Sequence, residues 1–151
     1  MTMDTNKRLA ISLFLIRITV FLVMFMWTLR KYFDPVHAGK LFAKYYSIPG
    51  LNEVMIYGIV AVQLVIIFAF LFGIAKYWSY GLVMLLHGGS TLSPFMAYFA
   101  PYEGHHLLFF AAWPMLAACV ALFLLRDNDT MCVFKRPDSS DGDAAQSEKG
   151  A

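Results

Sequence analysis

Apolar residues along the chain are gathered into four long runs, separated by short segments rich in charged residues, proline and glycine. The runs cover residues 9–29, 54–74, 77–100 and 106–125. Each run is about as long as the 20 residues that a helix needs to cross the hydrocarbon core of a bilayer. A segment surrounded by lipid must satisfy its own backbone hydrogen bonds, as a helix does. The pattern therefore predicts an all-α membrane protein built as a four-transmembrane-helix bundle.

The amino-acid composition argues against an ordinary soluble domain. Hydrophobic residues make up 60% of the chain and charged residues 15%, with a mean hydropathy of +0.61, whereas soluble domains have about 45–50% apolar and about 25% charged residues. The surplus apolar surface must face lipid or a partner. A net charge of +2 gives no indication of a nucleic-acid partner. The two cysteines, Cys119 and Cys132, form no C-x-x-C pair, which argues against a thiol oxidoreductase.

The positions of Lys and Arg predict the orientation of the spans, because the cytoplasmic loops of membrane proteins are enriched in these residues. With four spans, both termini share a side with the turn at residues 73–77. That side carries Lys7, Arg8, Lys76, Arg126, Lys135, Arg136 and Lys149, and the other side carries Arg30, Lys31, Lys40 and Lys44. We therefore expect a multi-pass protein with both termini in the cytoplasm. Residues 1–8 form its N-terminal segment, residues 9–126 its membrane domain, and residues 127–151 a polar, largely disordered tail.

The segment between the first two runs, residues 30–53, has the pattern of a short amphipathic helix. Asp34 followed by Pro35 is a typical helix start, and Ile48, Pro49 and Gly50 are typical of a stop. Polar and aromatic residues alternate at helical spacing between these points. We interpret this segment as an interfacial helix anchored at the outer surface of the membrane.

Polar side chains inside the apolar runs are the first candidates for function, because ionisable groups in a bilayer are costly and usually face the bundle interior. Arg17, Gln63 and His87 lie about 12–15 Å from the ends of their spans, at 1.5 Å per residue. Thr91 follows His87 on the same helical face. Two interpretations stay open. These side chains hold the helices together by hydrogen bonds, or they line a midplane pocket that binds a quinone head group or another small polar ligand.

A second polar group is expected on the outer side, where His37, Glu103, His105 and His106 are weak candidates for metal ligands. Their spacing is not diagnostic, because the adjacent His105 and His106 would point to different sides of a helix. We therefore predict no metal site and no catalytic residue. Bis-histidine haem is disfavoured as well, because His87 has no second histidine at its depth.

Proline at position 114 interrupts the fourth run. Because proline lacks a backbone donor, we expect it to kink the helix over residues 106–125 and to free the carbonyl near Phe110. Alanines around it favour close helix contact. We interpret these features as packing features.

Several segments together resemble a known family. A basic segment closes the first run, an extended outer segment ends near Ile48, and Gly73 lies in the turn before the third run. Residues 80–93 (YGLVMLLHGGSTLS) and 107–126 (LLFFAAWPMLAACVALFLLR) look like a DoxX-like subgroup, and the resemblance to the DoxX family covers residues 8–129. It implies a small bacterial inner-membrane protein of four helices, with relatives that accompany thiosulfate:quinone oxidation or other membrane redox complexes. It implies no catalytic residue.

Three functions follow from these patterns. The first is an accessory or anchoring subunit of a quinone-linked redox system, with no activity of its own and with a membrane redox protein or further copies of itself as partner. The second is a quinone-binding or small-ligand-binding oxidoreductase subunit that uses the midplane residues Arg17, Gln63, His87 and Thr91, with quinone as its cofactor. The third is an oligomeric transporter of a small solute, which the lack of an inverted repeat disfavours.

Overall fold

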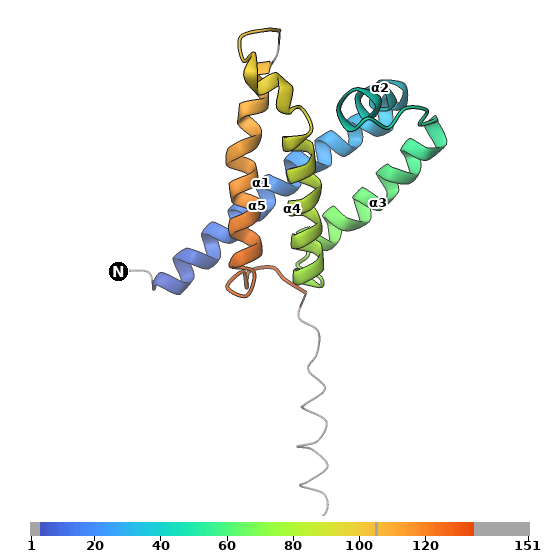
Figure 1. Cartoon of the computed structure of the whole chain (residues 1–151). Coiled ribbons are helices and arrows are strands. Elements are labelled where there is room, and N and C mark those ends of the chain that lie inside the picture. The colour runs from blue at the N-terminus through green and yellow to red at the C-terminus, as the bar shows by residue number, and fades with distance from the viewer. Residues whose placement is uncertain (1–3, 105, 135–151) are drawn as a thin grey trace, which may run out of the picture.

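A computed structural model describes residues 4–104 and 106–134, and within these residues the chain is helical, without strands. The all-α prediction is therefore confirmed for this part of the chain. The helices are α1 (Thr5–Phe33), α2 (Pro35–Tyr46), α3 (Glu53–Leu71), α4 (Lys76–Leu92), α5 (Ala112–Leu124) and the 3-10 helices η1 (Phe95–Phe99) and η2 (His106–Ala111) (Figure 1).

Three helical segments are long and apolar enough to cross a membrane: Thr5–Phe33, Glu53–Leu71 and His106–Leu124. The third combines η2 with α5. Helix α4 is shorter, with 17 residues, and it leads through a turn into η1. The prediction of helices long and apolar enough to cross a membrane is thus confirmed for three segments, and a fourth crossing, by α4, stays a prediction.

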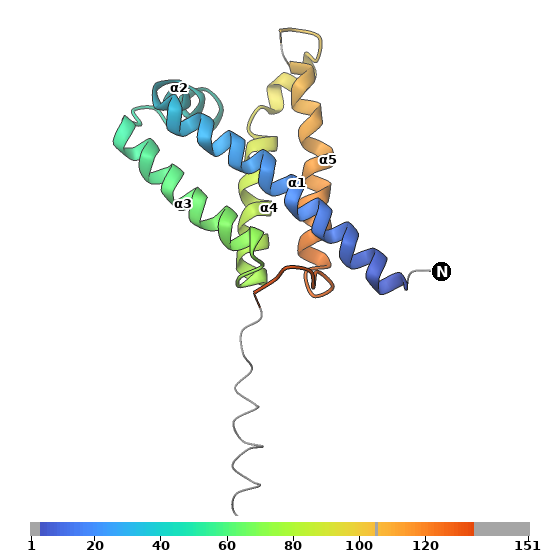
Figure 2. The ribbon, with the colours of Figure 1, turned by 180° about the vertical axis from the view of Figure 1, so that it is seen from behind.

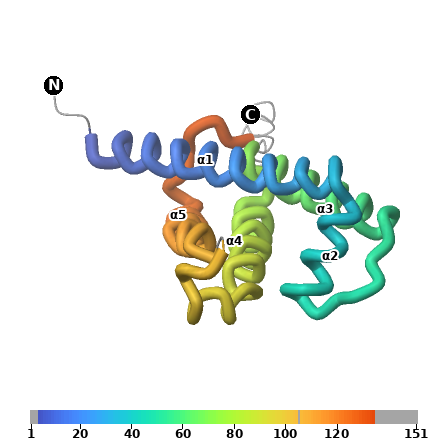
Figure 3. Tube along the Cα trace, turned by 90° about the horizontal axis from the view of Figure 1, so that it is seen from above, coloured from blue at the N-terminus to red at the C-terminus, as the bar shows by residue number. Residues whose placement is uncertain are grey.

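Helix α1 runs along one side of the molecule and contacts α3, α5 and α2 (Figure 3). Helices α4 and α5 pack side by side, and α3 and α4 diverge from the turn that joins them (Figure 2). The α3–α4 turn and the chain that follows α5 lie at one end of the molecule, which we name the turn end. Helix α2, η1 and η2 lie at the opposite end, which we name the α2 end.

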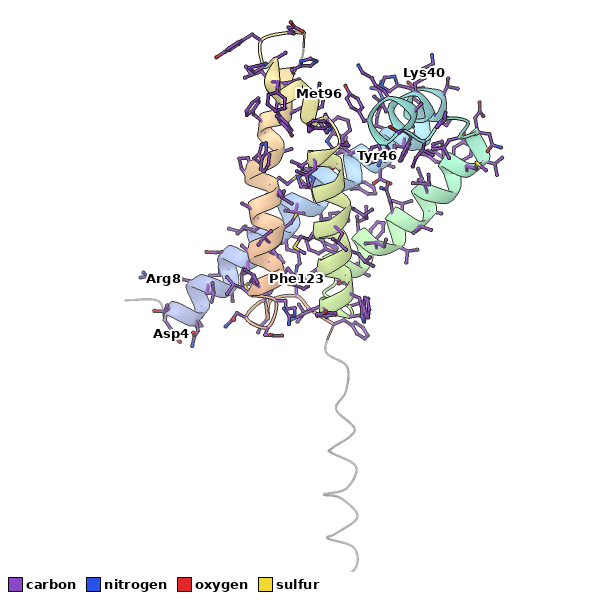
Figure 4. The ribbon with its side chains drawn as sticks, viewed as in Figure 1. Asp4, Arg8, Lys40, Tyr46, Met96 and Phe123 are labelled. Atoms are coloured by element: carbon purple, nitrogen blue, oxygen red, sulfur yellow. The ribbon has the colours of Figure 1, made fainter. Side chains whose placement is uncertain are left out.

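The buried core is small and lies mainly between α1, α3, α4 and α5. Its fully buried members include Leu13, Val20, Ile67, Phe70, Tyr80, Val83, Cys119 and Leu122. A second, smaller cluster joins α2 to α3 through Ala38, Ile56 and Val60. Many large apolar side chains on every long helix point outward instead, and Figure 4 draws the side chains of the described residues. Apolar surface of this extent must be covered by lipid or by another protein.

The short helix predicted between the first two runs is present as α2. The carboxylate of Asp34 accepts a hydrogen bond from the backbone N–H of His37 at 3.1 Å, and Pro35 occupies the first helical position. The carboxylate accepts a hydrogen bond from one of the backbone N–H groups that have no partner at the start of a helix. Proline has no N–H, so its position adds no further unpaired group. The helix ends at Ser47, which has the left-handed φ of 56°. Ala38 is buried against α3, and Lys40 and Tyr46 lie at the α2 end of the molecule (Figure 4).

The fourth apolar run differs in detail from the prediction of one kinked helix. It starts as the 3-10 helix η2 and continues as α5 from Ala112, so Pro114 is the third residue of α5. The first turn of an α-helix tolerates proline, because its N–H groups have no partner within the helix. The missing donor is therefore accommodated by a change of helix type before Pro114 instead of a kink inside a long α-helix.

The chain after α5 also differs from the prediction of a separate polar tail from residue 127 onward. Residues 126–134, which we name the C-terminal strap, pack against the turn end, and Asp129 within them is completely buried. A carboxylate can be buried there because it meets a buried arginine, as described below. The rest of the predicted tail, residues 135–151, lies outside the described residues.

Candidate functional site

Arg17 is fully buried, and its guanidinium is the centre of a cluster of polar contacts. Nη1 donates hydrogen bonds to Oδ2 of Asp129 and to the hydroxyl of Tyr80, each at 3.0 Å. Nη2 donates to the backbone carbonyls of Met131 and, at 3.4 Å, of Cys132. A side chain of α1 thus binds α4 and the C-terminal strap at the same time.

Tyr80 closes this cluster. Its hydroxyl donates to Oδ2 of Asp129 at 2.6 Å while it accepts the hydrogen bond from Arg17. Its ring packs edge-on against Phe70 of α3, with ring centroids 4.9 Å apart. A buried arginine and a buried aspartate each lose their hydration, and only close pairing with further hydrogen bonds offsets that cost. The three side chains provide this pairing.

Lys76, the first residue of α4, binds main-chain carbonyls of the strap through its side chain. Its Nζ donates to the carbonyl of Arg126 at 3.1 Å and to the carbonyl of Asp129 at 2.6 Å. Farther along, the backbone N–H of Phe134 donates to the carbonyl of Phe72 at 2.9 Å. The strap is therefore fixed at several points to the α3–α4 turn.

Gly73 gives the strap room at this turn. Its φ is +63°, a conformation that favours glycine. A Cβ added here would lie 2.6 Å from Cγ1 of Val133 and 3.4 Å from Nη1 of Arg17. The absence of a side chain at Gly73 thus allows both the turn and the close approach of the strap.

The other side chains proposed for a midplane pocket have separate partners. Nε2 of His87 lies 3.1 Å from the carbonyl of Ala112, to which it donates and so joins α4 to α5. The Thr91 hydroxyl donates to the carbonyl of His87 at 2.8 Å. Gln63 accepts a hydrogen bond from Nζ of Lys31 at 2.8 Å, which joins α3 to α1.

Arg17 therefore lies at a different level from His87. Its partner Tyr80 precedes His87 by seven residues on α4, which corresponds to about 10 Å along the helix. No hydrogen bond joins Arg17, Gln63 and His87 to one another in the part of the chain that the structure describes. These contacts favour the interpretation as interhelical hydrogen bonds, and the ligand pocket stays a prediction.

Sequence reasoning missed Asp129 and the role of Tyr80. Tyr80 lies seven residues before His87 and thus on the same helical face, but a tyrosine in a membrane helix carries no specific signal. Asp129 follows the last apolar run in a polar segment, where an aspartate is ordinarily exposed. The one usable signal was Arg17, because a guanidinium inside a membrane domain usually pairs with an acidic side chain or with backbone carbonyls.

Two of the hollows on the described surface lie near the α2 end. The larger, of about 670 Å³, is an open groove lined by Phe95, Tyr98, Phe99, Phe110, Trp113 and Pro114. The smaller, of about 400 Å³, lies between α2 and the start of α3. Neither is lined by the four residues proposed for the midplane pocket. The Tyr98 hydroxyl donates to the carbonyl of Thr91 at 2.8 Å, so this polar group of the larger groove is already bonded.

The weak metal candidates do not converge among residues 4–104 and 106–134, where no group of three or more His, Cys, Asp or Glu side chains is placed to hold a metal. The ring Nδ1 of His106 lies 2.9 Å from the carbonyl of Ala100 and donates to it. His37 and Glu103 are exposed. His105 lies outside the described residues.

No family model matches the chain, and no curated protein or solved structure matches it. The DoxX resemblance therefore stays a prediction that rests on the sequence segments alone.

Proposed function

We propose that this chain is a four-span, DoxX-like protein of the bacterial inner membrane that anchors or supports a redox partner near the quinone pool. The partner supplies the chemistry. The observation that carries this proposal is that the buried polar side chains are already hydrogen-bonded, whereas the outer surface of the helices is apolar. Buried polar groups such as Arg17 and His87 are bonded to the protein itself, while large apolar side chains face outward on every long helix.

The packing of α4 supports a fourth crossing. Helix α4 runs beside α5, which belongs to a segment long enough to cross, and its continuation η1 packs on η2. The 17 residues of α4 alone span about 26 Å at 1.5 Å per residue, close to the hydrocarbon core of about 30 Å. An even number of crossings places residue 4 and the strap on one side, and the excess of Lys and Arg supports the cytoplasm for that side.

Two exposed glycines support a partner helix in the membrane. A Cβ added at Gly58 of α3 or at Gly89 of α4 would meet no atom within 4 Å. Glycine weakens a helix slightly, and in membrane proteins it commonly allows a second helix to approach closely. These positions thus mark where a partner can approach α3 and α4.

The test is purification of the tagged chain in mild detergent or nanodiscs, with mass spectrometry of bound proteins and lipids. A redox protein recovered in stoichiometric amount supports the proposal and identifies the reaction. A stable chain recovered alone, without a protein partner, contradicts it.

The two glycines provide matched variants for this experiment. Gly58→Leu and Gly89→Leu fill open space, so each should leave the thermal stability of the isolated chain unchanged or slightly raised. Loss of the partner in one variant but not in the other locates the contact. Retention of the partner in both variants excludes close helix contact at these two positions.

The second candidate is the binding of quinone or of another flat apolar ligand. The aromatic groove of about 670 Å³ favours it, because its size and its lining suit a ring. Trp113 lines this groove, so bound quinone should quench its fluorescence, whereas Trp27 lies exposed on α1 and serves as an internal reference. Quenching lost in Trp113→Phe supports the groove. Loss of quinone binding in a folded His87→Ala variant instead supports the midplane pocket of Arg17, Gln63, His87 and Thr91.

A further inference from the structure

The polar cluster at the turn end is built around one carboxylate. Nη1 of Arg17 and the hydroxyl of Tyr80 both donate to the same oxygen, Oδ2 of Asp129, at 3.0 and 2.6 Å. Nζ of Lys76 binds the main-chain carbonyl of the same residue. One cation and one hydroxyl thus bind the carboxylate of Asp129, and a second cation binds its main chain. This arrangement of donors is typical of a site that binds oxyanions.

The pairing between Arg17 and Asp129 leaves one hydrogen-bonding atom of each side chain unbonded. Nε of Arg17 and Oδ1 of Asp129 are both buried and have no hydrogen-bond partner in the described part of the chain. The strongest arginine–carboxylate pairs use two parallel N–H···O bonds, one to each oxygen. Here Nη1 of Arg17 and the hydroxyl of Tyr80 donate to the same oxygen. A carboxylate or phosphate that is free to turn could also accept a hydrogen bond from Nε of Arg17, which Asp129 leaves unbonded.

The strap that carries Asp129 lies outside the apolar core of the helices. Its residues take no part in the buried apolar cluster that joins α1, α3, α4 and α5. It is attached by hydrogen bonds to Arg17, Tyr80, Lys76 and Phe72, and by the contact at Gly73. The guanidinium of Arg126 also lies over the rings of Tyr77 and Phe123. Segments with few buried apolar contacts open at a lower free-energy cost than the packed helices do.

We propose that Arg17, Tyr80 and Lys76 form an oxyanion-binding site at the turn end, which Asp129 occupies as an internal ligand on a releasable strap. An external carboxylate or phosphate takes the place of Asp129 when the strap moves away. This anion is either a soluble ion or the phosphate of an anionic phospholipid head group. The site is independent of the redox role proposed above.

The first test removes the internal ligand. In Asp129→Gly, the full chain in detergent should unfold at a lower temperature than the wild type. Saturating sodium formate should raise the midpoint of this variant by about 5 °C, because a ligand that binds only the folded state stabilises it. Sodium chloride at equal ionic strength should not. Asp127→Gly is the matched control, since Asp127 is exposed beside the buried aspartate, and formate should leave its midpoint unchanged.

Two further arms specify the site and the source of the anion. The double variant Arg17→Gln with Asp129→Gly should lose the response to formate. In nanodiscs, a lipid head group is identified if Asp129→Gly unfolds at a higher temperature in phosphatidylglycerol than in phosphatidylcholine. A soluble anion is identified if only formate or inorganic phosphate raises the unfolding temperature of this variant. A response no larger than that to chloride in every arm overturns the proposal.

The wild-type chain provides the same test if Asp129→Gly does not fold. Inorganic phosphate should compete with Asp129 and release the strap, so the Phe134 amide, which is bonded to the Phe72 carbonyl, should exchange its hydrogen faster. The expected acceleration is severalfold, measured against sodium chloride at equal ionic strength. Equal exchange in the two salts overturns the proposal.

Discussion

Arg17 and Asp129 are 112 residues apart in the chain, yet Nη1 of the arginine lies 3.0 Å from Oδ2 of the aspartate. Both side chains have a relative exposure of 0%. The arginine belongs to the first helix and the aspartate follows the last, so this ion pair joins the two ends of the described chain. It also ties the C-terminal strap to the helices.

Substituting only one residue of this pair should lower the free energy of unfolding substantially. Arg17→Met leaves the carboxylate of Asp129 buried without its cation, and removal of one partner of a buried pair typically costs about 3–5 kcal/mol. We expect a loss of this size in the free energy of unfolding. Reversible unfolding in mixed detergent micelles measures it.

Removing both partners should cost much less. Arg17→Met combined with Asp129→Leu replaces the pair with apolar side chains and leaves no uncompensated charge, a change that is often close to neutral. The double variant should therefore recover most of the stability that Arg17→Met loses. If the two single losses simply add in the double variant, the ion pair is not coupled as the structure implies.

Tyr80→Phe tests the hydroxyl that lies between the two charges. The substitution keeps the ring against Phe70 but removes the hydrogen bonds to Arg17 and Asp129. Hydrogen bonds to charged groups contribute about 1.5–3 kcal/mol, and we expect the unfolding free energy to fall by this amount. Tyr77→Phe, at an exposed position one turn earlier, should change it by less than about 0.5 kcal/mol. Equal losses in the two variants would contradict the assignment.

Gly73→Ala should displace the strap as well as strain the turn. A left-handed conformation costs a non-glycine residue roughly 1–2 kcal/mol, and the added Cβ would lie 2.6 Å from Val133, an overlap that costs about 1–3 kcal/mol more. Gly50→Ala separates the two effects, because Gly50 has a φ of 83° but no atom within 4 Å of an added Cβ. Thermal unfolding should show the larger loss for Gly73→Ala. A loss no larger than that of Gly50→Ala would mean that the strap does not pack there.

The sequence was most informative about features that neighbouring residues determine. Three apolar runs became long helices because lipid-facing helices need continuous apolar residues, and α2 starts at Pro35 because Asp34 and proline are a local start signal. These features depend on neighbours in the chain. They can therefore be predicted without knowledge of the fold.

The candidate site was harder to predict because it depends on contacts between distant segments. Depth along a helix placed Arg17 level with His87, but α1 crosses the molecule at an angle and brings Arg17 to the turn end instead. Its acidic partner lies beyond the last helix, in a segment that has the composition of a tail. Which of several nearby acidic residues would be buried could not be decided from the sequence, since Asp127 and Asp129 differ only in their place in the fold.

His87→Leu tests whether His87 acts in packing. The imidazole donates one hydrogen bond from α4 to the Ala112 carbonyl of α5. Hydrogen bonds between membrane helices contribute about 0.6 kcal/mol on average and up to about 1.7, so the variant should fold with a loss in that range. Ser90→Ala, which removes a hydroxyl bonded only within its own helix, should have less effect. A loss of several kcal/mol would indicate that His87 has a further buried role.

The number of membrane crossings can be decided by labelling single cysteines from either side of the membrane. Suitable positions are Ile48→Cys, Tyr102→Cys and the native Cys132, all exposed, with Tyr102 at 91%. The two introduced cysteines are each combined with Cys132→Ser. Cys119 is buried and should not react.

If α4 crosses the membrane, residues 48 and 102 lie on one side, and Cys132 lies on the other. An impermeant maleimide should then label Ile48→Cys and Tyr102→Cys in intact spheroplasts and Cys132 only in inverted vesicles. If α4 does not cross, residue 48 shares a side with Cys132, because only α3 and α5 then separate them. Labelling of Ile48→Cys and Cys132 from the same side would therefore contradict the four-span arrangement, whatever the orientation of the whole protein.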